Sequence, residues 1–119
     1  MYSVLVIDDE QMIRELLQKA LSRVNFTVET AEDGARGISK FDSGEFDLVI
    51  TDVRMPGADG HEVVHHIRGS RRQATPVIGV SGTPWLVKEG EFDDVLCKPF
   101  SIHALIESAR ALTNYPLAG

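Results

Sequence analysis

The stretch VLVIDD at residues 4–9 joins an uninterrupted apolar run to two acids. A short apolar run bounded by turn-forming residues predicts a buried strand. Similar runs occupy residues 48–51, 77–80 and 95–97, while residues 26–30 alternate between apolar and polar side chains and predict one more strand. Strands that are apolar throughout are typical of a parallel sheet, because helices cover both of its faces.

Helical patterns separate these strands, with apolar residues recurring at every third or fourth position. They cover residues 12–24, 34–41, 63–67 and 102–112. Ser101 is a suitable N-cap for the last helix. Residues 82–92 show the weakest pattern and predict at most a short helix around Leu86 and Val87. Five strand–helix units predict an α/β fold, a flavodoxin-like doubly wound parallel sheet with strand order 2-1-3-4-5 and a short or irregular fourth helix.

Composition places the chain among ordinary globular domains. No linker or repeat divides the 119 residues, so we expect one domain over residues 1–119 with no output domain. Acids outnumber bases 18 to 12, which argues against direct nucleic-acid binding, because such binding relies on lysine and arginine. The only cysteine, Cys97, excludes an internal disulfide and fits a reducing compartment; we expect it to be buried. With no signal-peptide pattern and no membrane-spanning stretch, the sequence predicts a cytoplasmic protein.

Polar side chains follow four of the predicted strands. Asp8 and Asp9 follow the first, Asp52 the third, Ser81 the fourth and Lys98 the fifth. The carboxyl ends of parallel strands meet at one edge of the sheet, where open α/β proteins bind their ligands. Neighbouring carboxylates repel one another unless a cation lies among them, and Mg²⁺ prefers such oxygen ligands. Carboxylates form acyl phosphates, so Asp52 is a candidate nucleophile, with Lys98 and Ser81 as partners of the phosphoryl oxygens.

Four motifs carry a resemblance to a known family. They read VIDDE at residues 6–10, DVRMPGADG at 52–60, VSG at 80–82 and CKPF at 97–100. Each motif alone is weak evidence, but the four occur in family order, at nearly the family spacing, across essentially the whole chain. On these motifs the chain resembles the receiver domain of two-component response regulators.

The resemblance implies a phosphoacceptor and not a turnover enzyme. Asp52 would accept a phosphoryl group from a sensor histidine kinase or a phosphotransfer protein, and the chain would signal to a separate effector by conformational change. Ser81 and Lys98 would contact the phosphoryl group, and the Lys98–Pro99 peptide bond would be cis. The implied ligands of Mg²⁺ are Asp9, Asp52, the backbone carbonyl of Arg54 and, through water, Asp8. The resemblance leaves open whether the chain forms a homodimer.

The chain departs from the family at the expected switch. The aromatic residue that usually precedes the lysine by three positions is Val95, and the segment from Ser81 to Val95 is shorter than usual. Trp85, in this segment, is expected to cover the core, with an exposed anchor for a partner protein as the alternative. Two alternatives therefore stay open, a phosphorylation-independent receiver-like binding module and a small Mg²⁺-dependent aspartyl-phosphate phosphohydrolase. The second lacks its usual pair of acids separated by one residue, because Asp8 and Asp9 are adjacent.

The stretch HEVVH at residues 61–65 matches the H-E-x-x-H signature of zinc proteases. The apolar residues of this short helix form its buried face, so we expect His61 and His65 to point toward solvent. No third ligand is evident in the sequence. We therefore interpret the stretch as a solvated helix surface and not as a zinc site.

Overall fold

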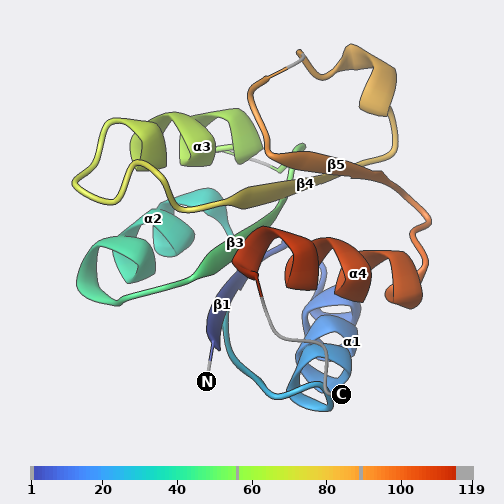
Figure 1. Cartoon of the computed structure of the whole chain (residues 1–119). Coiled ribbons are helices and arrows are strands. Elements are labelled where there is room, and N and C mark those ends of the chain that lie inside the picture. The colour runs from blue at the N-terminus through green and yellow to red at the C-terminus, as the bar shows by residue number, and fades with distance from the viewer. Residues whose placement is uncertain (1, 56, 89, 115–119) are drawn as a thin grey trace.

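Five parallel strands form one sheet in the order β2-β1-β3-β4-β5, as the sequence predicts. The computed structural model describes residues 2–55, 57–88 and 90–114; Pro56, within one of the quoted motifs, lies outside the described residues. The strands are β1 (Tyr2–Ile7), β2 (Phe26–Ala31), β3 (Leu48–Asp52), β4 (Val77–Ser81) and β5 (Asp94–Cys97). Because all strands run in one direction, their carboxyl ends lie along the same edge of the sheet (Figure 1).

Two helical layers cover the sheet (Figure 1). The helices are α1 (Gln11–Ser22), α2 (Gly34–Ser43), α3 (Gly60–Arg68) and α4 (Ile102–Thr113). Side chains of α1 and α4, such as Leu17 and Leu105, share one core cluster, while Phe41 of α2 and Ile67 of α3 belong to the cluster on the opposite face. Among the described residues, no helix combines the length and the apolar character that a membrane crossing requires.

Side-chain caps fix where three of these helices begin. Asp33 accepts a hydrogen bond from the Arg36 N–H, and Asp59 accepts from the N–H groups at the start of α3. The predicted cap of the last helix is confirmed, because Ser101 accepts from the Ala104 N–H. Such caps satisfy backbone donors that have no partner inside the helix. Asp59, the residue just before α3, therefore fixes where this helix begins after the loop that follows β3.

The segment between β4 and β5 contains only the one-turn 3₁₀ helix η1 (Pro84–Leu86) among its described residues. This finding confirms the expectation of a short or irregular fourth helix. Val87 and Val95 pack against the core cluster on this face, and Phe92 is one of its buried members. Val87 and Phe92 of this segment, packed with Val95 of β5, therefore cover part of the sheet that a full helix would otherwise cover.

Two expectations about this region are wrong. Trp85 is 73% exposed and does not cover the core, because a single turn of 3₁₀ helix does not lay its side chains across the sheet. Cys97 is also exposed, because it is the last residue of the edge strand β5. Apolar character alone therefore did not predict burial in the one-turn helix or at the end of the edge strand.

Gly60 lets α3 approach the end of β3. A Cβ atom at this position would lie 2.7 Å from the Asp52 carbonyl oxygen and 2.8 Å from the Val53 Cα. We expect Gly60→Ala to push α3 away from the strand and to lower the free energy of unfolding by about 2 kcal/mol. Urea denaturation would measure the loss.

Gly69 provides the matched control, because it lies at the other end of the same helix. A Cβ atom there would come no closer than 3.6 Å to the His65 carbonyl oxygen, an ordinary contact. Gly69→Ala should therefore change stability by less than about 0.5 kcal/mol. Equal losses in the two variants would contradict the close approach of α3 to β3.

Candidate functional site

The predicted polar residues meet at the carboxyl edge of the sheet. The Lys98 Nζ atom lies 3.0 Å from the Asp52 Oδ2 atom and 3.6 Å from the Asp8 Oδ2 atom. Both carboxylates are buried, whereas the Lys98 side chain is 23% exposed. Strands β1, β3 and β5 thus bring residues from three distant parts of the sequence into direct contact.

The position of Lys98 follows from the pairing of β5 with β4. The Lys98 N–H donates to the Ser81 carbonyl oxygen at 2.9 Å, which continues the strand ladder by one residue. The Lys98–Pro99 peptide bond is cis, as the resemblance implies. The lysine side chain can then extend over the ends of the central strands.

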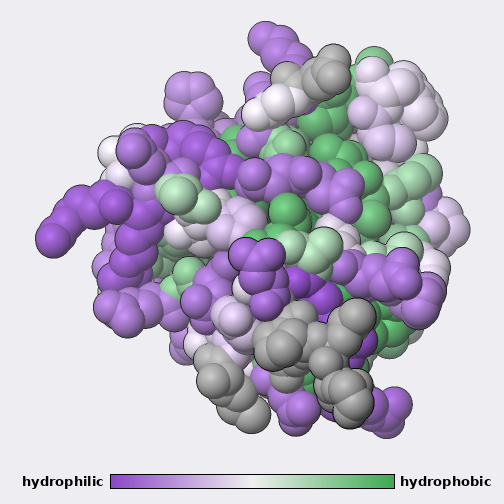
Figure 2. All heavy atoms as spheres, in the orientation of Figure 1, coloured by the Kyte–Doolittle hydropathy of each residue, from purple (hydrophilic) through white to green (hydrophobic). Residues whose placement is uncertain are grey.

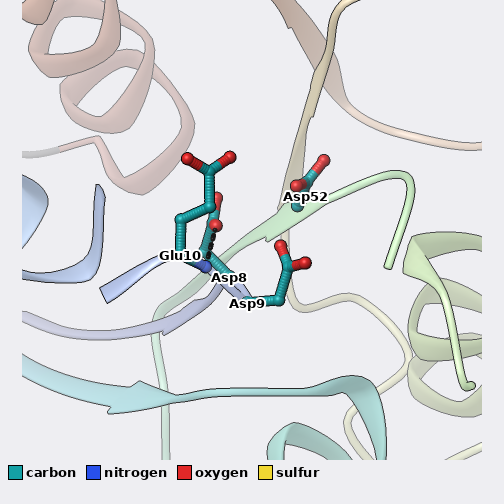
Figure 3. Close-up of side chains that lie close together, drawn as sticks. All are labelled: Asp8, Asp9, Glu10 and Asp52. Carbon is teal, nitrogen blue, oxygen red and sulfur yellow. Dashed lines mark hydrogen bonds between the residues drawn. The ribbon is translucent and has the colours of Figure 1, made fainter. Parts of the chain in front are cut away.

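Four acids lie together beside this lysine. Asp8, Asp9, Glu10 and Asp52 each offer one carboxylate oxygen, and these oxygens lie within 4.8 Å of one another. Figure 3 shows three of the side chains on consecutive residues after β1 and the fourth at the end of β3. Asp8 and Asp52 are buried, whereas Asp9 and Glu10 are exposed. Oxygen donors in such a group could hold a hard divalent cation.

Sequence reasoning assigned no role to two residues of this region, Glu10 and Arg14. The Glu10 Oε1 atom lies 3.6 Å from the Lys98 Nζ atom, and its backbone N–H donates to Asp8 Oδ1 at 2.9 Å. The Arg14 Nη1 atom donates to the Asp8 carbonyl oxygen at 2.8 Å, which fixes the turn after β1. The position of Glu10 directly after Asp8 and Asp9 could have indicated that it belongs to the acidic group. The contact of Arg14 with the Asp8 carbonyl oxygen depends on the geometry of α1 and has no such signal in the sequence.

Burial raises the pKa of the Asp8 carboxyl above its usual value, and the charges of Asp52 and Asp9 act in the same direction. The Glu10 N–H and the positive charge of Lys98 oppose this rise without cancelling it. Burial also disfavours the charged form of Lys98, but its hydrogen bond to Asp52 and the surrounding carboxylates outweigh burial and raise the pKa of its ammonium group. One ammonium group thus faces several carboxylates, an arrangement that favours a further cation.

Asp8→Asn is expected to raise the free energy of unfolding at pH 7 in metal-free buffer, by about 1 kcal/mol. Asparagine keeps the oxygen that accepts from the Glu10 N–H but removes a buried charge. Because the pKa of Asp8 is higher in the folded than in the unfolded chain, the folded chain binds more protons. The free energy of unfolding of the wild type should therefore fall as the pH rises from the pKa of Asp8 in the unfolded chain through its higher pKa in the folded chain. The variant has no carboxyl group at this position and should not show this fall.

Urea denaturation at several pH values in the presence of EDTA would measure this difference. Asp9→Asn is the control, because Asp9 is exposed and its replacement should change the pH profile less. Identical pH profiles for the wild type and Asp8→Asn would contradict a desolvated carboxyl at this position.

Asp52 is held from both sides of its carboxylate. Its Oδ2 atom accepts from Lys98, and its Oδ1 atom accepts from the Arg54 N–H at 3.3 Å. The Val53 N–H donates to the Val80 carbonyl oxygen at 2.9 Å, so the chain just after β3 remains bonded to β4. The carboxylate therefore has a fixed position with one oxygen next to a positive charge.

The Ser81 hydroxyl is buried near the same edge but turns to a different partner. Its Oγ atom accepts from the Thr83 N–H at 3.0 Å and lies 3.5 Å from the Thr83 Oγ1 atom. Ser81, Thr83 and Arg54 line a cavity of about 200 Å³. The structure thus brings Ser81 to the predicted edge, with its hydroxyl engaged by the segment that follows β4.

The two histidines of the zinc-protease motif are placed differently from each other. His65 is exposed, as expected, but His61 is half-buried and its Nδ1 atom lies 2.5 Å from the Glu91 Oε2 atom. Within residues 2–55, 57–88 and 90–114, the acidic cluster is the only group of three or more potential metal-ligating side chains. The contact of His61 with the segment before β5 was not predictable from the helical pattern.

Comparisons with known proteins agree with this architecture. The sequence profile of the response regulator receiver domain matches residues 4–110. The transcriptional regulatory protein TcrA of Mycobacterium tuberculosis is 36% identical over 116 residues, a match that covers 93% of this chain and 46% of TcrA. The transcriptional regulatory protein ResD of Bacillus subtilis is 38% identical over 114 residues, covering 92% of this chain and 47% of ResD. The chain spans about half the length of these curated relatives.

Solved structures show the same fold over nearly the whole chain. The response regulator TrrA of Thermotoga maritima, crystallised in complex with Mg²⁺-BeF, has a TM-score of 0.86 and 35% identity, covering 94% of this chain and 99% of TrrA. The chemotaxis response regulator CheY4 of Vibrio cholerae has a TM-score of 0.87 and 30% identity, covering 94% of this chain and 98% of CheY4. The profile match and the shared fold lead to one assignment: this chain belongs to the response regulator receiver domain family.

Proposed function

We propose that this chain accepts a phosphoryl group on Asp52 in a Mg²⁺-dependent reaction and changes conformation as a result. The donor is a phosphohistidine on a sensor histidine kinase or a phosphotransfer protein. One observation carries the proposal: Asp52 is 7% exposed, its carboxylate lies 3.0 Å from the Lys98 ammonium, and it belongs to the cluster of four acids. A nucleophile, a positive charge and oxygen ligands for a cation therefore occupy one place.

The chemistry of the transfer suits a carboxylate. An oxygen of Asp52 attacks the phosphorus atom and forms an oxygen–phosphorus bond. The bond from phosphorus to the imidazole nitrogen of the donor breaks, and that nitrogen keeps the electron pair. No base is required, because a carboxylate has no proton to lose. Such a reaction depends mainly on positioning and on neutralisation of charge.

The donor set fits Mg²⁺, because it consists of carboxylate oxygens with more negative charge than one lysine neutralises. We assign Asp9, Asp52 and the backbone carbonyl of Arg54 as ligands and Asp8 as a contact through water. When bound, Mg²⁺ supplies positive charge for the phosphoryl oxygens. Asp8 and Asp9 then hold this charge next to Asp52.

Lys98 and Ser81 complete the proposed site. The Lys98 ammonium, already beside Asp52, is placed to pair with an oxygen of the transferred group. The Ser81 hydroxyl can donate to another oxygen after it turns away from Thr83. Phosphorylation thus exchanges the partners of two side chains, which connects the chemistry to a change in shape.

The test is incubation of the protein with acetyl phosphate and Mg²⁺, followed by intact-mass measurement. We expect the mass to increase by one phosphoryl group, and we expect EDTA to prevent the increase. No increase with any donor would favour the alternative of a phosphorylation-independent binding module. Sustained multiple turnover of phosphate esters would instead favour a phosphohydrolase.

A further inference from the structure

The segment between β4 and β5 is attached to the last turn of α3. We call its described residues, 82–88 and 90–93, the strap. Asp93 Oδ2 accepts from the Arg68 Nη2 atom and from the Val77 N–H, both at 2.7 Å. The Asp93 N–H donates to the Val77 carbonyl oxygen at 2.9 Å. These bonds join the end of the strap to α3 and to the first residue of β4.

A second attachment joins the strap to the first turn of α3. The His61 Nδ1 atom lies 2.5 Å from the Glu91 Oε2 atom. In the described part of the chain this shielded oxygen has no hydrogen-bond partner apart from that contact. A shielded carboxylate oxygen that loses its only partner is costly, so the contact resists opening. Both ends of α3 therefore hold the residues just before β5.

Phe92, between these two attached residues of the strap, packs into the core cluster. It is 8% exposed, and its ring lies 5.8 Å from the His61 ring, centroid to centroid. Gly79 of β4 leaves room for it, because a Cβ atom there would lie 3.0 Å from the Phe92 ring. Figure 2 shows hydrophobic residues in the space that the orange loop frames in Figure 1. Residues 91–93, which we call the anchored half of the strap, are thus packed as well as paired.

Residues 83–87, which we call the η1 half, are held differently. The Thr83 N–H donates to the Ser81 Oγ atom, and the other backbone bonds that this turn makes with described residues are internal to it. Trp85 and Leu86 are 73% and 60% exposed. Apart from the packing of Val87 against the core, the η1 half is therefore held by the hydroxyl that is proposed to contact the phosphoryl group.

We propose that α3 fixes the anchored half of the strap, so that phosphorylation of Asp52 moves only the η1 half and the exposed Trp85 and Leu86 on it. This inference rests on the proposed function. When the Ser81 hydroxyl turns toward the phosphoryl group, it leaves the Thr83 N–H, and the η1 half loses its bond to β4. The contacts of Glu91 and Asp93 do not involve Ser81, so they persist. Because a ligand can shift a conformational equilibrium only through contacts that differ between the two states, the shift is confined to the η1 half.

Hydrogen exchange measured by mass spectrometry on the full chain tests this division. The wild type is compared with and without Mg²⁺ and beryllofluoride, the group bound with Mg²⁺ in the TrrA structure. We expect exchange in residues 83–87 to change about tenfold, and exchange in residues 91–93 to stay within about twofold. An equal change in both halves would overturn the proposal.

The variant Glu91→Gln tests the attachment itself. Without any ligand it should raise exchange in residues 91–93 about tenfold, because a neutral amide is a weaker partner for the His61 ring than a carboxylate. Added beryllofluoride should then change exchange through the whole strap. Exchange in residues 91–93 of this variant that equals the wild type would overturn the proposal.

Glu107→Gln is the matched control, because the His103–Glu107 pair has the same chemistry on the exposed surface of α4, with an N–O distance of 3.1 Å. It should leave exchange in the strap unchanged, and an effect equal to that of Glu91→Gln would overturn the attachment. If neither beryllofluoride nor acetyl phosphate acts on the wild type, the proposed function fails together with the phosphorylation step. The ligand-free effect of Glu91→Gln would then still decide whether α3 holds the anchored half.

Discussion

Asp52→Asn is expected to abolish phosphoryl incorporation from acetyl phosphate, with an initial rate at least about 10³-fold below that of the wild type. The amide lacks the charged oxygen that attacks phosphorus. The fold should survive, because asparagine has nearly the same volume and its oxygen can still accept from the Arg54 N–H, now at 3.3 Å. Intact-mass spectra over a time course would measure the rate, and a thermal unfolding curve would confirm the fold.

The matched control for this variant is Asp59→Asn. Asp59 is a nearby acid in the loop that follows β3, but it caps α3, and the ion pairs of Lys98 with described residues are with Asp8, Glu10 and Asp52. Asparagine is also a good N-cap, so stability and phosphorylation should both be retained. Phosphoryl incorporation into Asp52→Asn at the wild-type rate would show that another residue is the acceptor.

Lys98→Met is expected to lower the free energy of unfolding in metal-free buffer by about 3 kcal/mol. The ammonium lies within 3.6 Å of carboxylate oxygens of Asp8, Glu10 and Asp52, and methionine keeps the length of the side chain without its charge. Added Mg²⁺ should restore more stability to this variant than to the wild type, because it supplies the missing positive charge. Urea denaturation with and without Mg²⁺ would measure both effects.

Lys19→Met serves as the control for loss of a lysine. Lys19 is exposed in the last turns of α1, so its replacement should change stability by less than about 0.5 kcal/mol and should not alter the effect of Mg²⁺. If Lys98→Met and Lys19→Met behaved alike, the Lys98 ammonium would not be the charge that holds the carboxylates together.

The sheet was predictable because its strands carry apolar residues on both faces. Residues 4–7 and 48–51 are fully apolar or nearly so, and the structure buries them between two helical layers. The ends of the elements were less predictable. For example, β1 begins at Tyr2, where backbone pairing with β2 extends the strand beyond the apolar run.

The convergence of Asp8, Asp52 and Lys98 was predictable for a topological reason. Parallel strands place their carboxyl ends along one edge, so a residue that follows each strand arrives at the same place. The participation of Glu10 depends on where a long side chain reaches, and strand order does not determine that. The rotamer of Ser81, turned toward Thr83, likewise depends on the backbone of the strap.

The contacts of the strap could not be predicted from the local sequence pattern. His61 lies in a helix and Glu91 in an irregular segment, and nothing in either stretch indicates that they pair. Phe92 is buried because Gly79, on a neighbouring strand, leaves room for its ring. Both contacts depend on tertiary packing between distant segments, so Trp85 could not be distinguished from Phe92 as the aromatic residue that is buried.

The exposure of Cys97 has a practical consequence. It is the single cysteine of the sequence, and it immediately precedes Lys98. An accessible thiol reacts readily with maleimide reagents once it is deprotonated. One fluorescent or spin label would therefore attach at a single known position at the end of β5, next in sequence to Lys98, without prior removal of other thiols.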